Sequence, residues 1–292
     1  MAASTSVEHR QRRMSSASTT AVATLLPLGL VMLFFFVVPL LGMAVTSVQA
    51  PGGGVSLEHY ESLASGRRWL ALRNSIFIST VSSLLAAVVG TIIAWGISHI
   101  NSRILNAVTG VLSSVLANSG GAALAFSFIV LFGNAGYLIS FITGMDSGFT
   151  LYSSKGLVLM YQYFLIPTMV LLLLPSMQAL RTEWKEANTS LGGSQFVFWR
   201  KIGIPILSPA IIGGFVLLFG SAFATHASAA VLLGSGAFPL ITLQIANELG
   251  GTAAVGGQNA AMAMGLVTAV VAIVVLIVFN LLQGRSQKWL QR

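Results

Sequence analysis

Long apolar stretches alternate with short polar segments along the chain. A helix that crosses a bilayer needs about 20 predominantly apolar residues, because each residue advances the helix by about 1.5 Å. Stretches of this length are predicted to be helices, since backbone groups in lipid must be satisfied within the segment. The predicted spans are residues 21–46, 74–98, 104–132, 157–180, 207–233 and 256–282. The pattern therefore predicts an all-α, polytopic membrane protein with six transmembrane helices.

The first apolar stretch follows Arg10, Arg12 and Arg13, an order that also occurs in secretory signal peptides. The stretch is longer than the 7–15 apolar residues that are typical of signal peptides, so we predict a retained first span. The remaining divisions are a tail at 1–20, a loop at 47–73, a five-span core at 74–282 and a tail at 283–292.

The basic residues indicate the orientation, because Lys and Arg are enriched in cytoplasmic loops. With the N-terminus inside, four basic residues lie outside, namely Arg67, Arg68, Arg73 and Lys155. The other eleven of the fifteen lie inside, namely Arg10, Arg12, Arg13, Arg103, Arg181, Lys185, Arg200, Lys201, Arg285, Lys288 and Arg292. Both termini and the segment 181–206 are therefore predicted to be cytoplasmic.

Composition agrees with this class. Hydrophobic residues make up 55% of the chain and charged residues only 8%, against about 25% charged in a typical soluble domain. The net charge of +8 does not predict nucleic-acid binding, because the basic residues lie in short segments between apolar stretches. The chain has no cysteine, which excludes disulfides and thiolate metal sites.

The segment 181–206 is the longest polar interruption between two apolar stretches of the core. A charged side chain near the bilayer centre costs roughly 2.5–3.5 kcal/mol, so this segment, with Glu186 and Arg200, is predicted to lie in water. Gly192 and Gly193 are expected to end a first short helix, because glycine tolerates positive φ. Ser194 is expected to cap a second short helix by accepting a backbone N–H.

The second short helix is expected to carry Phe196, Phe198 and Trp199. Exposed aromatic side chains on a polar element favour docking into the groove of a partner. An interfacial helix, with Phe196 and Trp199 in the lipid headgroups, is the alternative from composition alone.

The same segment contains Glu186-Ala187, then Gly192, and later Ile202-x-Ile204-Pro205. This pattern resembles the EAA loop of ABC-importer permeases, in which Glu-Ala-Ala is followed by Gly and then by Ile-x-Leu-Pro. The resemblance covers about residues 70–285 and implies the MetI-like, type I permease architecture. It implies that the loop couples to a separate ATPase. The coupling residues that it implies are Glu186, Ala187, Gly192, Ser194, Phe196, Ile202 and Pro205.

The resemblance also implies the partners. These are a second permease subunit, identical or homologous, two ATP-binding cassette subunits, an extracytoplasmic solute-binding protein and the lipid of a prokaryotic inner membrane, but no nucleic acid. ATP and Mg would bind the partner ATPase subunits, so this chain is expected to hold no cofactor and to be no enzyme.

The loop departs from the family pattern at three positions. Asn188 stands where the family often has Ala, and Gly193 stands where Ala is common, so two adjacent glycines are expected to loosen the turn. Leu191 replaces the Asp that sugar permeases often have before Gly192. The loop is thus more similar to the spermidine/putrescine-type branch, which groups with iron, phosphonate and oxyanion importers. A sugar importer is the alternative.

Polar residues inside spans are candidates for the translocation pathway, because they are costly in lipid. The fifth predicted span carries Ser221, Thr225 and Ser228 at helical spacing, with His226 beside them. Their alternative role is helix packing. Asn118, next to a Ser-Gly-Gly sequence, either lines a cavity or kinks the third span, and Gln162 either lines the pathway or belongs to an interfacial belt.

The sequence lacks the motifs of nucleotide binding, of metal binding and of ion-coupled transport. The sequence has no G-x-x-x-x-G-K-[ST] phosphate-binding loop, and its four histidines lie far apart. The predicted spans contain no Asp or Glu, which disfavours a secondary carrier or channel because ion-coupled carriers commonly use buried carboxylates.

Overall fold

The structure, a computed structural model, describes residues 25–50, 54–100, 102–145, 148–234, 238–251 and 257–290. These residues are helical apart from turns, loops and one isolated antiparallel bridge between Gln49 and Val55, which confirms the all-α class. The predicted tail 1–20, with its three arginines, lies outside the described residues, as do residues 21–24 of the first predicted span.

Among the described residues, five helices are long and apolar enough to cross a membrane, or six if one bent pair counts as a single span. Three of the five lie within single helices, namely α4 (Gly66–Ile100), α8 (Ser154–Gln178) and Gly257–Val278 of α14 (Gly257–Leu290). The span Leu25–Ser47 contains η1 (Leu33–Val37) and α2 (Val38–Ser47). The span Gln195–Ala224 contains α10 (Gln195–Phe198), η2 (Trp199–Gly203) and α11 (Ile204–Ala224). Helix α4 begins at Gly66, before the predicted bound at residue 74. Its first turns carry Arg67, Arg68 and Arg73, so the apolar stretch alone did not indicate them.

The third predicted span, 104–132, is not one continuous helix. It is divided into α5 (Arg103–Asn118) and α6 (Ala122–Phe132), which are bent by 100°. Gly121 has φ +83°, a conformation that glycine adopts without steric cost. The Ser-Gly-Gly sequence therefore breaks the helix, and of the two roles predicted for this region, the structure shows the bend.

The fifth predicted span, 207–233, also differs from the prediction. Helix α11 ends at Ala224, and α12 (Ala227–Leu233) begins after an interruption at Thr225 and His226. Thr225 has extended backbone angles of φ −66° and ψ 119°. The helical spacing of Ser221, Thr225 and Ser228 predicts that they share one face of a continuous helix, and this prediction is wrong because the helix is broken between Ser221 and Ser228.

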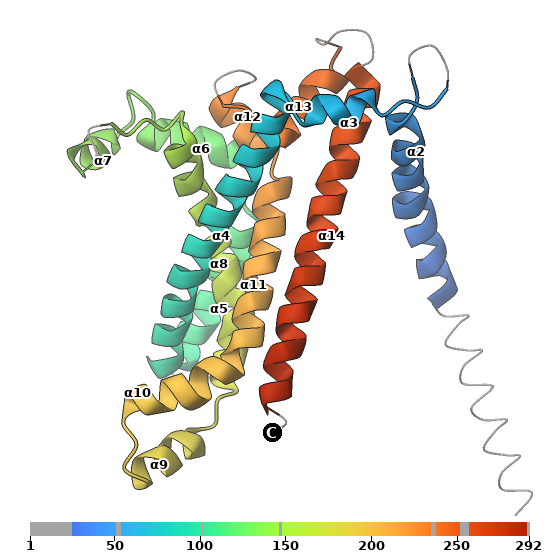
Figure 1. Ribbon diagram of the computed structural model, residues 1–292. Coiled ribbons are helices and arrows are strands. Elements are labelled where there is room, and N and C mark those ends of the chain that lie inside the picture. Colours follow the sequence, from blue (N-terminus) through green and yellow to red (C-terminus); the bar gives the residue numbers. More distant parts are fainter. Residues whose placement is uncertain are drawn as a thin grey trace, which may run out of the picture.

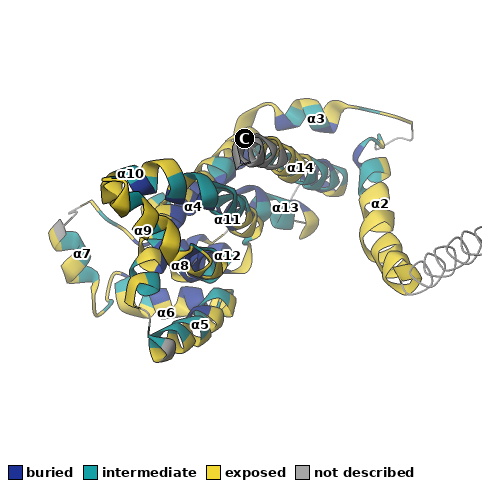
Figure 2. Ribbon diagram, turned by 90° about the horizontal axis from the view of Figure 1, so that it is seen from below, coloured by how far each residue is buried: buried dark blue, intermediate teal, exposed yellow. Residues whose placement is uncertain are grey.

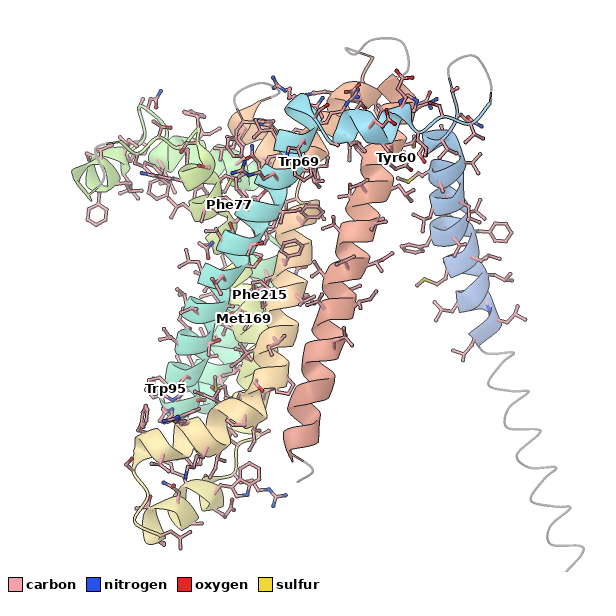
Figure 3. All side chains as sticks on the ribbon, viewed as in Figure 1. Tyr60, Trp69, Phe77, Trp95, Met169 and Phe215 are labelled. Carbon is pink, nitrogen blue, oxygen red and sulfur yellow. The ribbon has the colours of Figure 1, made fainter. Side chains whose placement is uncertain are left out.

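Helices α4, α8 and α11 pack side by side as the central bundle (Figure 1). Gly90 brings α4 close to α8, since a Cβ at that position would lie 2.6 Å from Met169 Cβ. Met169 is fully buried and belongs to the core against which Phe215 of α11 packs (Figure 3). Small residues at helix interfaces allow this kind of approach.

Helix α14 packs on α11, and α2 contacts α14 on the outside of the bundle. Figure 2 shows α2 almost entirely exposed, while the bundle helices have buried faces. Short helices cover both ends of the molecule (Figure 1). The end drawn at the top carries α3 (Glu58–Leu63), α7 (Ile139–Met145), α12 and α13 (Ile241–Leu249), and the opposite end carries α9 (Thr182–Ser190) and α10.

Candidate functional site

The 181–206 loop folds as the predicted helix, turn and helix. Helix α9 ends in a turn at Gly192, which has φ +76°. The N–H of Gly193 donates to Asn188 O at 2.8 Å, and the N–H of Gly192 donates to Thr189 O at 2.9 Å. This pair of bonds is the Schellman arrangement, which satisfies the last carbonyls of a helix. Ser194 then caps α10 by accepting the N–H of Val197, as predicted.

A side chain of α9 contacts the turn that the two glycines form. Asn188 Nδ2 donates to Gly193 O at 3.0 Å and to Ser194 O at 3.2 Å, so its side chain spans the turn from α9 to the start of α10. A Cβ on residue 193 would lie 2.7 Å from Asn188 Cγ and 2.9 Å from Nδ2. Asn188 and Gly193, two of the three departures from the family pattern, therefore contact each other directly.

The aromatic residues of the loop do not all face outward, which corrects the prediction. Phe196 is 71% exposed, whereas Phe198 is buried at 5%. Trp199 packs edge-on against Trp95 of α4, with ring centroids 6.3 Å apart, and Figure 3 shows Trp95 at the end of the bundle that meets α10. The exposed apolar side chains beside the turn are Phe196 and Leu191, which is 88% exposed.

The other predicted coupling residues divide between the two arms of the loop. Glu186 and Ala187 lie on α9 and are exposed, and Ile202 lies in η2 and is half-buried. Pro205 does not start a new helix, because the helix runs on from Gln195 to Ala224. The nearby Pro209 lacks the N–H that would bond to Pro205 O, and Ser208 Oγ donates to that carbonyl at 2.9 Å instead.

The two helix breaks of the membrane region lie against each other. Ser228 Oγ, on α12, donates to Gly121 O at 2.9 Å, at the break between α5 and α6. Thr242 Oγ1, on α13, approaches Thr225 O at 3.3 Å, at the break between α11 and α12. Broken helices are tolerated at membrane depth where they line a cavity or are buried in protein. The contacts of Ser228 and Thr242 were not predicted, because each joins distant parts of the chain.

Four of the five predicted pathway residues lie at these breaks. Asn118 ends α5, Ser221 lies in the last turn of α11, and Thr225 and His226 separate α11 from α12. Asn118, Ser221 and His226 are exposed, so both breaks leave polar side chains at the surface of this chain.

Gln162 lies apart from the breaks. Its Nε2 donates to Ser82 O of α4 at 3.2 Å and to Val158 O of its own helix at 3.0 Å. Its Oε1 and the hydroxyls of Ser82 and Ser83 are buried without a hydrogen-bond partner. Gln162 therefore belongs to a polar seam between α4 and α8, a location that neither predicted role described.

An ion pair joins the short helices at the end opposite the 181–206 loop. Arg68 donates to Glu248 Oε1 through Nε at 3.2 Å and through Nη2 at 2.9 Å, and its Nη1 donates to Ser62 Oγ at 2.7 Å. The Glu248 side chain is only 6% exposed. The pair connects α3, the start of α4 and α13. Among the described residues there is no group of three or more His, Cys, Asp or Glu that could hold a metal ion.

Comparisons with known proteins agree on one class. No family model matches the chain. A sulfate transport system permease protein from Synechocystis sp. is 25% identical over 270 residues, which are 88% of this chain and 87% of that protein. A spermidine/putrescine transport system permease protein from Haemophilus influenzae is 27% identical over 167 residues, which are 57% of this chain and 60% of that protein.

A solved structure shares the fold. It is a bacterial ABC transporter involved in the import of the acidic polysaccharide alginate, one chain of which superposes with a TM-score of 0.73. The sequence identity is 18%, and the superposition covers 94% of this chain and 99% of that chain.

Proposed function

We propose that this chain, whose homologues are permease subunits of ABC transporters and which has several helices able to cross a membrane, forms the translocation pathway of a binding-protein-dependent importer and couples that pathway to a separate ATPase. The observation that carries the coupling role is the turn of the 181–206 loop, which the side chain of Asn188 spans with two hydrogen bonds. Leu191 and Phe196 project from this turn without burial, and such apolar side chains fit a partner's cleft.

The distribution of basic residues supports an orientation with the 181–206 loop in the cytoplasm, where the proposed ATPase subunits bind. ATP-driven closure of the two ATPase subunits moves the two coupling loops of a permease pair. The solute-binding protein docks at the opposite end and delivers the solute. Hydrolysis and release then return the pathway to its inward-facing state, so this chain supplies pathway and coupling while the partner subunits hold ATP and Mg.

The pathway is assigned to the paired helix breaks. Interrupted membrane helices place backbone and side-chain polar groups beside a solute at membrane depth. His226 and Thr225 offer such groups at one break and Asn118 at the other. The solute is a small polar or charged molecule of the polyamine, phosphonate, iron or oxyanion type. The alternative is a sugar, for which the structural similarity to the alginate importer is a specific observation.

The coupling role is tested with Glu186→Lys and Gly192→Leu in the importer reconstituted with its ATPase and binding protein. Both variants should insert normally and hydrolyse ATP while uptake is lost. Glu183→Lys, the same charge change on another exposed position of α9, is the matched control and should retain uptake. Normal uptake in both test variants would contradict the coupling role. Uptake that survives ATP depletion but stops when the ion gradient is collapsed would identify a secondary carrier.

The pathway role is tested with His226→Ala, which should change uptake without reducing assembly with the ATPase. Loss of assembly would assign His226 to packing instead. Gln162→Ala serves for comparison, because its contacts in the α4–α8 seam predict a lower folded yield and unchanged solute selectivity. The solute itself is identified by the ligand that the cognate binding protein captures.

A further inference from the structure

A cavity of about 500 Å³ separates the 181–206 loop from the ends of the bundle helices. Its walls come from five helical elements, α4, α5, α8, α9 and the α10–η2 helix. The lining residues are Ser98, His99, Asn106, Met177, Gln178, Leu180, Arg181, Thr182, Lys185, Phe198 and Trp199. Nothing in the proposed coupling or pathway roles uses this cavity.

The charges of the lining have one sign. Arg181 and Lys185 contribute two cations from the start and the middle of α9, and no lining residue is Asp or Glu. The two acidic residues of α9, Glu183 and Glu186, are exposed and are not part of the wall. A cavity with two cations and no carboxylate attracts an anion, and basic pockets between membrane helices on the cytoplasmic side are suited to anionic headgroups.

The remaining wall supplies neutral polar groups at fixed positions. His99 Nδ1 donates to Trp95 O at 3.0 Å, because a carbonyl can only accept, and this bond fixes the ring beside Trp95, with ring centroids 4.7 Å apart. Asn106 Oδ1, in the α5 wall, is buried and has no hydrogen-bond partner. A buried polar atom without a partner is costly, but this oxygen is an acceptor with no exposed surface, so the groups that would hold an anion are the two cations.

We propose that this cavity binds a phosphate group, carried either by the headgroup of an anionic phospholipid or by a soluble phosphate. Both cations belong to the 181–206 loop, Arg181 as the N-cap residue of α9 and Lys185 within that helix, while the neutral polar groups come from α4, α5 and α8 as well. The bound anion therefore ties the loop that carries Glu186 to the ends of the spans. Because anion binding needs neither ATP nor the ATPase, an experiment on the chain alone tests this site independently of the coupling role.

The test uses the full chain in nanodiscs, first with phosphatidylcholine alone and then with added phosphatidylglycerol, and native mass spectrometry counts the retained anionic lipid. Arg181→Gln/Lys185→Gln should weaken retention by about 25-fold, or about fivefold for each cation. Lys185→Gln alone should weaken it about fivefold, which provides a second, milder variant. Arg200→Gln/Lys201→Gln removes two exposed cations that do not line the cavity and should change retention less than twofold.

A second arm adds inorganic phosphate to the chain in phosphatidylcholine nanodiscs and follows binding by phosphorus NMR. Binding that depends on Arg181 and Lys185 in this arm alone assigns the site to soluble phosphate, and binding in the lipid arm assigns it to the headgroup. No binding in either arm overturns the proposal. Equal weakening by the cavity pair and by the control pair also overturns it, because general surface attraction would then account for the result.

Discussion

The Gly193→Ala substitution tests whether the side chain of Asn188 holds the turn of the 181–206 loop. A Cβ at residue 193 would lie 2.7 Å from Asn188 Cγ, so the Asn188 side chain must rotate away. Rotation breaks its two bonds to Gly193 O and Ser194 O. Two such bonds at a half-exposed site contribute about 1–2 kcal/mol in total, which corresponds to an increase of about 5–30-fold in the opening of the turn.

Amide hydrogen exchange of the loop in the reconstituted importer measures this opening. Asn188→Ala should accelerate exchange as much as Gly193→Ala, because each removes the same two bonds. The double variant should be no worse than either single variant, since the new methyl group no longer meets an amide. Thr189→Ala removes a side-chain bond that stays within α9 and should leave exchange across the turn unchanged.

Additive effects in the double variant would refute this reasoning, because they would show that residues 188 and 193 act independently. Unchanged exchange in Gly193→Ala would refute it as well. If the expected pattern is found, ATP-coupled uptake in the same variants then measures how much of the coupling depends on a rigid turn.

Three further predictions concern helix packing. Gly90→Ala should lower stability by about 1–3 kcal/mol, because its Cβ would lie 2.6 Å from a side-chain carbon of α8. Gly96→Ala in the same helix meets no atom within 4 Å and is the control. Thermal inactivation in detergent should occur at a lower temperature for Gly90→Ala than for Gly96→Ala. Arg68→Ala should cost about 2–3 kcal/mol by leaving a buried carboxylate unpaired, and the exposed Arg73→Ala is its control in the same assay; equal melting would contradict this. Ser228→Ala should cost about 1 kcal/mol and increase exchange at the α5–α6 break, and unchanged exchange would mean that its bond to the Gly121 carbonyl is not needed.

Local chemistry explains what could be predicted from the sequence. Apolar length indicates helices that can span a membrane, and the predicted turn at Gly192 and cap at Ser194 depend on neighbouring residues only. The resemblance at Glu186 and Gly192 indicated the family to which the homologues belong. These features need no knowledge of how the helices pack.

The helix breaks could not be placed from hydropathy, because a bend changes no residue's hydrophobicity. The two glycines of Ser119-Gly120-Gly121 indicated a break between α5 and α6. The break between α11 and α12 lies at Thr225-His226, which contains neither Gly nor Pro. That break is accompanied by contact with Thr242 on α13. Likewise, the ion pair of Arg68 and Glu248 joins residues 180 positions apart, a distance over which a single sequence gives no indication of pairing.

The continuous helix Gln195–Ala224 links the two proposed functional regions mechanically. Its 30 residues form one uninterrupted helical stretch from the turn of the 181–206 loop to the break at Thr225, and Figure 1 shows this stretch bent where α10 and η2 lead into α11. If the ATPase and the solute bind where we propose, this one helical stretch joins the two regions without an intervening loop. Its one irregular stretch, η2, packs Trp199 against Trp95 of α4, so the same helical stretch also contacts α4. The proposed coupling and pathway regions therefore lie at the two ends of one helical stretch.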